Sequence, residues 1–222
     1  MEPIKWRILE ISGGKATILC EMIIDAHAYQ DDYYYFNINN TDYYYTTANA
    51  NGAPSETYAN NYKYSEIRAW LNDNFYNTAF NSMQKQLVNT VTIDNSARST
   101  NPDGNATQWN SGVNQYACEN TEDKVWLLSV QEATKKWQYC SFGSYSTFDT
   151  LRQKKTTDYA KANYAYTYTS SNYYGCGVWW LRSPIYNYPG YAWGVNVNGR
   201  YDGQNLVYSH SRGVSPALQI TL

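Results

Sequence analysis

The stretch that decides the fold lies near the C-terminus, where residues 178–218 read VWWLRSPIYNYPGYAWGVNVNGRYDGQNLVYSHSRGVSPAL. Short segments of alternating apolar and polar residues are separated here by single glycines. Alternation with a period of two is typical of strands, and glycine favours the turns between them. We therefore predict a C-terminal antiparallel sheet, with Val195, Val197 and Val214 on its inner face.

The N-terminal segment predicts a second β element. Residues 4–11 and 16–24 are rich in β-forming side chains and flank Gly13-Gly14, which provides a tight turn. We interpret them as a β-hairpin. Because two apolar β segments lie at opposite ends of the chain, we expect this hairpin to share a sheet with the C-terminal strand that ends at Leu222.

The middle of the chain predicts helices. Ser65 is placed to cap a helix that runs to about Asn77, and Ser82 begins a second, shorter one. A strand at 124–128 leads into Ser129-Val-Gln-Glu132, a capping box expected to begin a helix that ends near Trp137. A further helical turn is expected at 156–162.

The remaining segments set the fold class. Residues 31–61 and 94–122 are polar, contain Gly and Pro and show no periodicity, so both are expected to be long surface loops. A short strand is expected near 88–93. No repeat and no linker divides the chain. We therefore expect residues 1–222 to form one α+β domain with small antiparallel sheets, two main helices and long loops.

Composition excludes several classes of function. The 222 residues carry a net charge of -2, and only 16% are charged, so clustered basic residues for nucleic acid are missing. No run of 18 apolar residues predicts a membrane span, and no leader of the signal-peptide type precedes Pro3. Neither nucleic acid nor membrane insertion is expected.

The sequence offers no catalytic or metal-binding motif. The two histidines, His27 and His210, stand beside no activated nucleophile, and Asp31, Asp32 and Asp42 lie in the polar segment 31–61. We therefore expect no enzyme, no catalytic residue and no cofactor.

The cysteines give no zinc pattern either, since none forms a CxxC pair. Free thiols are expected at Cys20, Cys118, Cys140 and Cys176. A disulfide stays open as an alternative for an exported protein.

Composition favours binding instead. Tyr occurs 25 times and Trp 8 times, and residues 185–212 combine Tyr with Asn, Ser and Gly. Tyr and Trp provide large, rigid contact areas and the small polar residues provide adaptable hydrogen bonds, as in antibody recognition loops. The alternative is a Tyr- and Asn-rich strand-and-turn face that binds nothing.

Two motifs carry a resemblance to a known family. Trp179-Trp-Leu-Arg-Ser-Pro184 and Gly213-Val-Ser-Pro-Ala-Leu218 resemble the WWLRSP and GVRPAL segments of a bacterial and phage domain family of unknown function, with Ser215 in place of the family's usual Arg. Matches at 2–9, 65–80, 121–129 and 157–162 occur in the family's order. Members of that family resemble the variable proteins of diversity-generating retroelements, which have a C-type-lectin fold.

The resemblance implies a function. It implies a C-type-lectin-like fold, shared with formylglycine-generating enzymes, that presents a hypervariable ligand-binding region at about 185–212. Diversified codons of this kind do not encode Lys, Glu, Gln, Met or Trp, and only Trp193 and Gln204 depart from that rule between Ile185 and Arg212. A protein or cell-surface ligand is implied, on a cell surface or phage particle rather than in the cytoplasm.

The expected recognition residues are those of the variable region whose side chains should be exposed on one contiguous face. They are Tyr186, Asn187, Tyr188, Tyr191, Trp193, Asn196, Asn198, Tyr201, Asp202, Asn205, Tyr208, His210 and Arg212.

Two alternative functions stay open. An enzyme of the formylglycine-generating type would need a close cysteine pair near the C-terminus, where only Cys176 lies. A calcium-dependent sugar-binding lectin would need clustered carboxylates, and Asp202 is the only acid of the region.

Overall fold

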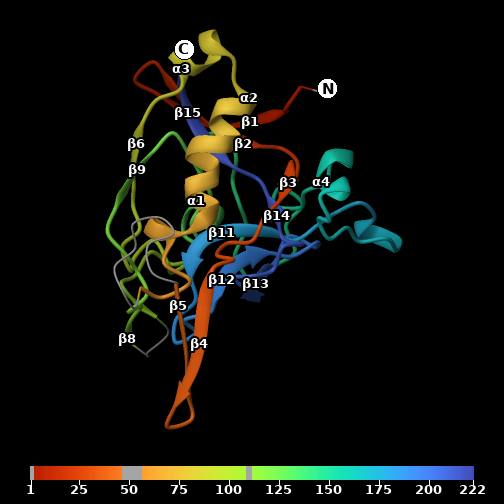
Figure 1. The fold of residues 1–222 in the computed structure, drawn as a ribbon. Helices are drawn as coiled ribbons and strands as arrows, with labels where there is room; N and C mark the ends of the chain where they lie inside the picture. The colour runs from red at the N-terminus through yellow and green to blue at the C-terminus, as the bar shows by residue number, and fades with distance from the viewer. Residues whose placement is uncertain (1–2, 47–56, 109–111) are drawn as a thin grey trace.

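The computed structural model describes residues 3–46, 57–108 and 112–222. Strands from both ends of the chain lie in its first sheet, of strand order β1-β2-β15-β10 (Figure 1). Strands β1 (Trp6–Ser12) and β2 (Lys15–Cys20) form the predicted hairpin, with Gly13 and Gly14 at φ 57° and 73° in its turn. Strand β15 (Ala217–Thr221) pairs antiparallel with β2, and β10 (Val125–Trp126) pairs with β15. The predicted pairing of the N-terminal hairpin with the C-terminal strand is confirmed.

The second sheet has the order β13-β12-β11-β14-β3. Strands β11 (Trp179–Pro184), β12 (Tyr191–Val195) and β13 (Tyr201–Leu206) are antiparallel neighbours, as expected. The expectation of a wholly antiparallel sheet was wrong, because β14 (Gly213–Val214) is parallel to β11. Residues 207–212 carry the chain across the sheet, so that β14 lies between β11 and β3 (Asp25–Ala26).

The long helical segment follows its predicted cap. The Ser65 hydroxyl accepts the Arg68 backbone N–H, and α1 (Glu66–Trp70), a π-helical turn (Leu71–Phe75) and α2 (Tyr76–Ala79) follow without a break. The second helix, α3 (Ser82–Leu87), is capped by Asn81 in a capping box with Gln84. Helix α4 (Asp158–Ala162) is capped by Thr157.

The predicted helix after Ser129 is a single turn. The capping box forms, because the Ser129 hydroxyl accepts the Glu132 N–H and the Glu132 carboxylate accepts the Ser129 N–H. Only the 3-10 turn η3 (Glu132–Thr134) follows, and Lys135 is extended. The expected continuation to Trp137 was wrong, since the Trp137 indole N–H donates to the Glu132 carbonyl and turns the chain away. Further 3-10 turns are η1 (Tyr62–Tyr64) and η4 (Ser171–Tyr173).

The interpretation of 31–61 as a loop was also wrong. Strands β4 (Tyr33–Ile38) and β5 (Thr41–Thr46) form a regular hairpin that projects from the body of the molecule (Figure 1). Asn39 and Asn40 form its turn at φ 50° and 62°, which Asn tolerates better than most residues. The rest of this segment includes residues 47–56, which lie outside the described residues.

The segment 94–122 is mostly irregular in its described residues, as expected, with one short pairing in its middle and another at its C-terminal end; residues 109–111 lie outside the described residues. Strand β6 (Val91–Ile93) pairs with β9 (Thr121–Asp123), and β7 (Thr107–Gln108) pairs with β8 (Gly112–Val113). The fold combines short helices with small sheets, so its class is α+β.

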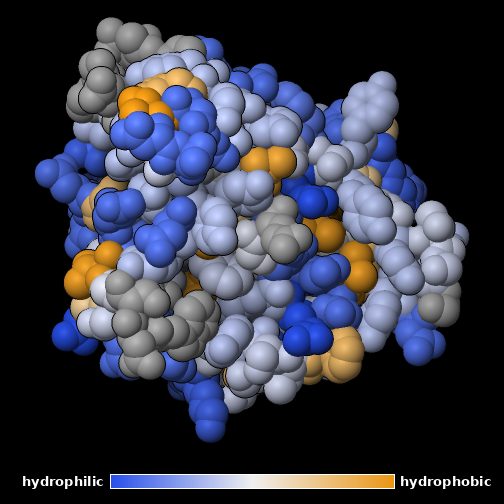
Figure 2. Space-filling view, turned by 90° about the horizontal axis from the view of Figure 1, so that it is seen from below, coloured by the Kyte–Doolittle hydropathy of each residue, from blue (hydrophilic) through white to orange (hydrophobic). Residues whose placement is uncertain are grey.

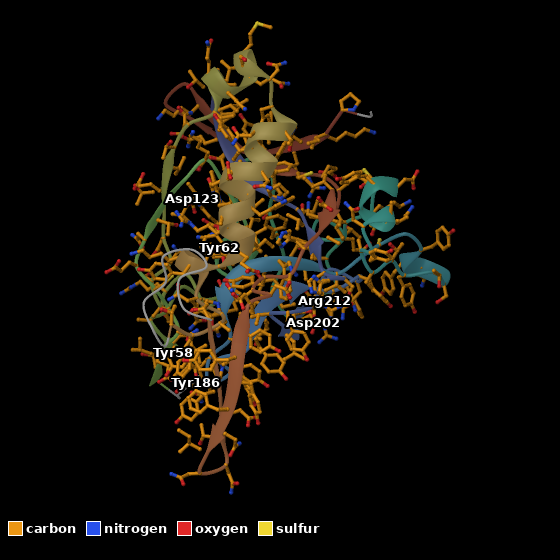
Figure 3. All side chains as sticks on the ribbon, in the orientation of Figure 1. Tyr58, Tyr62, Asp123, Tyr186, Asp202 and Arg212 are labelled. Atoms are coloured by element: carbon orange, nitrogen blue, oxygen red, sulfur yellow. The ribbon has the colours of Figure 1, made fainter. Side chains whose placement is uncertain are left out.

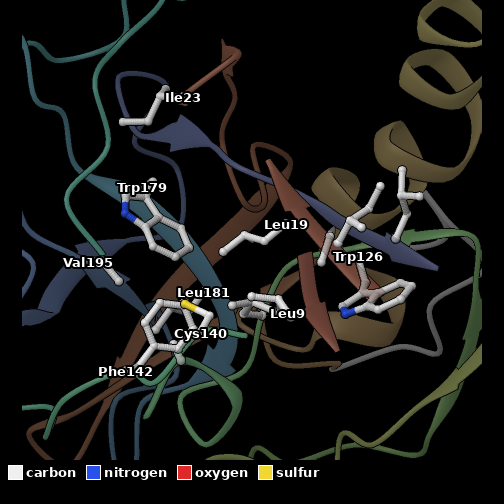
Figure 4. Packing of buried hydrophobic residues seen from close by; sticks show 14 of the residues in the cluster. Leu9, Leu19, Ile23, Trp126, Cys140, Phe142, Trp179, Leu181 and Val195 are labelled. Atoms are coloured by element: carbon white, nitrogen blue, oxygen red, sulfur yellow. The ribbon is translucent and has the colours of Figure 1, made fainter. Parts of the chain in front are cut away.

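The core lies on both faces of the second sheet. Trp179, Leu181 and Val195 belong to one apolar cluster, together with Leu9 and Leu19 of the first sheet (Figure 4). Trp180, Ala192 and Val214 belong to another, beneath helix α1. Both tryptophans are fully buried. Val195, Val197 and Val214 are buried as predicted, but they belong to three different apolar clusters, so the prediction that they share one inner face was wrong.

Three buried cations complete the core. Arg182 donates to the Leu127 carbonyl at 2.7 Å, to Asn95 and to the carboxylate of Glu132. Arg152 donates to the carbonyls of Gly199, Gly143 and Ser144. The Lys154 ammonium donates to the Cys20 carbonyl, and burial lowers its pKa to about 8. The two arginines join the irregular segments to the sheets, because each guanidinium satisfies more than one backbone carbonyl.

The cysteines are all free. No group of three His, Cys, Asp or Glu side chains suitable for a metal ion occurs in the part of the chain that the structure describes. Within the same residues, no helix has the length and apolar character needed to cross a membrane.

Candidate functional site

The variable region does not present its side chains evenly. Asn187, Tyr188, Tyr208 and His210 are exposed, whereas Asn205 is buried. The other predicted recognition residues are half-buried: Tyr186, Tyr191, Trp193, Asn196, Asn198, Tyr201, Asp202 and Arg212. The expectation that these side chains are largely exposed was therefore wrong for Asn205. It holds fully only for the four exposed residues, Asn187, Tyr188, Tyr208 and His210.

Core packing explains why Trp193 and Tyr201 are half-buried. Both rings pack against the cluster that contains Trp179, and they contact each other at a centroid distance of 6.1 Å. The Tyr201 hydroxyl donates to the Val130 carbonyl at 2.5 Å, and burial raises the pKa of Tyr201. These aromatic residues hold β12 and β13 to the body and belong to the scaffold.

Asn205 is part of the sheet interior. Its side-chain amide donates to the Asp202 carbonyl at 2.7 Å. A Cβ added at Gly194 would lie 2.8 Å from the same amide nitrogen. Asn205 therefore occupies the space that a side chain on β12 would need, and a varied residue at 205 would disturb that packing.

The asparagines of the β12–β13 turn serve local structure. The Asn196 side chain accepts the Val197 N–H, and the Asn198 side chain accepts the Arg200 N–H. Such side-chain turns are common uses of Asn. The antiparallel register of Tyr191 with Leu206 places this turn at the opposite end of the two strands from Tyr188 and Tyr208.

The predicted single recognition face is therefore wrong. Figure 3 shows Tyr186 on one side of hairpin β4–β5 and Asp202 and Arg212 on the other. The physical reason is that the sheet carries a core cluster on each face, so the region 185–212 reaches solvent mainly through its loops.

Exposed tyrosines from the loops instead join the hairpin that the sequence interpretation missed. Tyr33 stacks on Tyr208 with ring centroids 5.4 Å apart, and Tyr44 contacts Tyr33 and Tyr35 at 5.6 and 5.0 Å. Tyr188 contacts Tyr191 at 5.8 Å. We call this group the tyrosine surface; it comprises Tyr33, Tyr35, Tyr44, Tyr188, Tyr191 and Tyr208.

Backbone contacts bring the parts of the tyrosine surface together. The Tyr44 ring covers Gly190, where an added Cβ would lie 2.8 Å from it. The Asn60 side-chain amide donates to the carbonyls of Tyr188 and Tyr191, at 2.9 and 3.1 Å. The Tyr29 N–H donates to the Val207 carbonyl at 2.8 Å. The backbone that carries these rings is thus held by hydrogen bonds, so less conformational entropy is lost when a partner binds.

The opposite face of the hairpin is aromatic as well. Phe36 stacks on Tyr43 at 5.2 Å, Tyr45 contacts Tyr58 at 5.0 Å, and Tyr58 contacts Tyr116 at 4.7 Å. Tyr58 and Tyr186 lie at the base of the hairpin (Figure 3). A sequence signal for the hairpin existed, because YYYFNI and TDYYYT flank an Asn-Asn pair that suits a two-residue turn.

The chemistry of this end of the molecule suits binding. Figure 2 shows the face from which the hairpin projects as mostly blue and pale, with the most apolar residues in separate patches. Tyr offers an apolar ring and a hydroxyl that donates and accepts hydrogen bonds, so such a face can contact a polar partner without exposing a continuous aliphatic patch.

The comparisons with known proteins identify a family of unknown function. The profile of a domain of unknown function, DUF6273, matches residues 16–222, so the chain belongs to that family. No curated protein and no solved structure matches it.

Proposed function

We propose that this member of the DUF6273 family is a ligand-binding module whose recognition site is the tyrosine surface. The observation that carries the proposal is that Tyr33 and Tyr44 of the hairpin β4–β5 and Tyr208 of a distant loop form one partly exposed aromatic group, in which Tyr33 contacts both other rings. Tyr is enriched in binding hot spots because its rigid ring adds contact area at a small cost in entropy.

The proposal includes the C-type-lectin-like fold and diversification of the loops. An arrangement with both termini in one sheet and a second sheet ending in long loops supports the former. Exposure of Asn187, Tyr188, Tyr208 and His210 supports variation at these positions, because exposed sites tolerate many side chains. The buried Asn205 and the half-buried Trp193 are assigned to the fixed scaffold.

The ligand class follows from the surface. Tyrosine rings and hydroxyls in a chain of which only 16% is charged suit a protein or another cell-surface ligand. The proposed location is a cell surface or phage particle. Diversification has its own test, a near-copy of the codons for 185–212 beside a reverse transcriptase gene in the genome.

Binding is tested with an array of bacterial cell-surface proteins. The labelled protein is compared with a Tyr188→Ser/Tyr208→Ser variant and with a Tyr139→Ser/Tyr159→Ser control. Tyr139 and Tyr159 are also exposed, at 57% and 66%, but lie outside the tyrosine surface. We expect spots bound by the protein and by the control to be lost with the first variant. Equal binding by all three, or no bound spot, would contradict the proposal.

A further inference from the structure

A cleft of about 370 Å³ contains Asp31 and His210, each two residues along the chain from a member of the tyrosine surface, Tyr33 and Tyr208. Its size is in the range of sites that hold a small ligand or one large side chain. The segment after β3, the start of α1, the end of α4 and the loop before β14 form its walls. The lining residues are Ala26, His27, Ala28, Asp31, Glu66, Asn163, Tyr164 and His210. Both histidines of the chain thus lie in one cleft, which their separation in the sequence did not suggest.

Hydrogen bonds fix the polar groups of the cleft. His210 Nε2 lies 3.1 Å from Asp31 Oδ1. The Asp31 backbone N–H donates to Glu66 Oε2 at 2.6 Å. His27 Nδ1 lies 2.7 Å from the Ala28 carbonyl, which only accepts, so Nδ1 carries the proton and a neutral His27 ring keeps Nε2 as an acceptor.

The cleft therefore has more acceptors than donors and a negative charge. Each carboxylate, of Asp31 and of Glu66, has a second oxygen in addition to the one already used. The Asn163 side-chain nitrogen is already committed to Asp25 at 2.8 Å. Among the described residues that line the cleft, none is Lys or Arg. A complementary ligand must bring hydrogen-bond donors and a positive charge.

Tyr164 adds an aromatic ring at the rim, in a position where glycine is expected. It follows α4 at φ 67°, and the Ala165 N–H closes the helix end by donating to the Ala160 carbonyl. This left-handed position after a helix usually holds Gly. The Tyr164 side chain is 85% exposed, so it adds little to the core. An exposed ring at a cleft that is also lined by two carboxylates is well suited to a cation–π contact.

We propose that this cleft binds an ammonium or guanidinium group. Carboxylates bind such groups through charge-assisted hydrogen bonds, and the Tyr164 ring covers the cation. The carrier would be a Lys or Arg side chain of the protein bound by the tyrosine surface; this part rests on the proposed function, whereas cation binding by the cleft itself does not.

The histidines provide a direct readout. Because His27 and His210 are the only histidines, NMR signals of the imidazole C–H groups report on this cleft alone. Nα-acetyl-L-arginine amide (arginine amide below) is added as the probe, and Nα-acetyl-L-citrulline amide (citrulline amide below), which has a similar shape and carries no positive charge, serves as the control. We expect saturable shifts of both signals with arginine amide at a dissociation constant of about 1 mM or tighter, and none with citrulline amide.

Variants separate the cleft from its surroundings. Glu66→Gln and Asp31→Asn should weaken binding at least about tenfold. Asp158→Asn removes one negative charge from an exposed α4 residue outside the cleft and should leave binding unchanged. Tyr164→Gly should weaken binding while raising the melting temperature, a combination that a merely structural role would not produce.

The inference would be overturned if the histidine signals did not shift, or if arginine amide and citrulline amide shifted them equally. The Tyr188→Ser/Tyr208→Ser variant should still bind arginine amide. If this variant lost binding on the array but still bound arginine amide, the cation site and the tyrosine surface would be shown to act independently.

Discussion

The rings of Tyr33 and Tyr208 stack with centroids 5.4 Å apart and planes inclined by 18°. Tyr33 begins the hairpin β4–β5 and Tyr208 lies in the loop after β13. The contact joins two segments that the sequence interpretation treated separately, a supposed loop and a supposed recognition face. Together they form one surface.

Substitutions on the tyrosine surface should separate stability from binding. Tyr208→Ala loses a stacking partner and should lower the free energy of unfolding by about 1 kcal/mol. Tyr188→Ala, at a side chain that is 58% exposed, should lower it by less than about 0.5 kcal/mol. Urea denaturation measures both values. A loss well above these for Tyr188→Ala would assign that ring to the scaffold.

Asn205 should resist diversification. Asn205→Tyr forces a large ring into the space between Asp202 and Gly194, so we expect a loss of at least about 2 kcal/mol in the free energy of unfolding. His210→Tyr, at an exposed position of the same region, should change it by less than about 0.5 kcal/mol. Similar stability of the two variants would contradict the assignment of Asn205 to the scaffold.

Trp180 should be essential for folding. Its ring is fully buried and contacts Tyr29 at 5.6 Å, and its indole N–H donates to the His27 carbonyl at 2.8 Å. Trp180→Ala should cost about 3–5 kcal/mol of stability, a large part of what a typical domain has. An unchanged melting temperature would rule out this role.

Lys154 should leave a signature in the pH dependence of stability. Burial lowers its pKa from 10.5 to about 8 in the folded protein. Between these values the unfolded chain binds more protons, so the contribution of Lys154 to stability rises with pH. Relative to Lys154→Met, the protein that keeps Lys154 should gain about 1.5 kcal/mol between pH 8 and 9.5.

The Lys154→Met comparison cancels the titration of groups that do not interact with Lys154. Burial raises the pKa of Cys20 and Cys140 and the charge of Lys154 lowers it, so both proteins carry Cys20→Ser and Cys140→Ser in this experiment. The Cys20 carbonyl still accepts the Ser215 hydroxyl in the variant. A difference between the two proteins that stays constant from pH 8 to 9.5 would show that Lys154 titrates normally.

The sequence was sufficient to predict turns and helix starts where a single residue determines the backbone conformation. Gly13 and Gly14 adopt the positive φ of the predicted turn, and Ser65 caps the predicted helix. The capping box at Ser129 also formed, but the helix ended after one turn, because the Trp137 indole N–H donates to the Glu132 carbonyl. The Glu132 carboxylate also binds the buried Arg182. Nothing in the local pattern reveals that distant partner.

Faces were harder to predict than elements. The hairpin β4–β5 escaped notice because tyrosine follows tyrosine on both faces, which hides the alternation expected of a half-buried strand. The recognition face was assigned too broadly because composition does not show what covers a sheet. The second core cluster, around Tyr62 and Leu71, lies on the side that the prediction left open to solvent.

The account depends most directly on the affinity for a partner selected on the array. Biolayer interferometry compares the unsubstituted protein, Tyr33→Ala/Tyr208→Ala and the exposed control Tyr159→Ala. We expect a dissociation constant at least about tenfold higher for the double variant, equivalent to about 1.4 kcal/mol, and one within about twofold for the control. Equal affinities of all three proteins would contradict the assignment of recognition to the tyrosine surface.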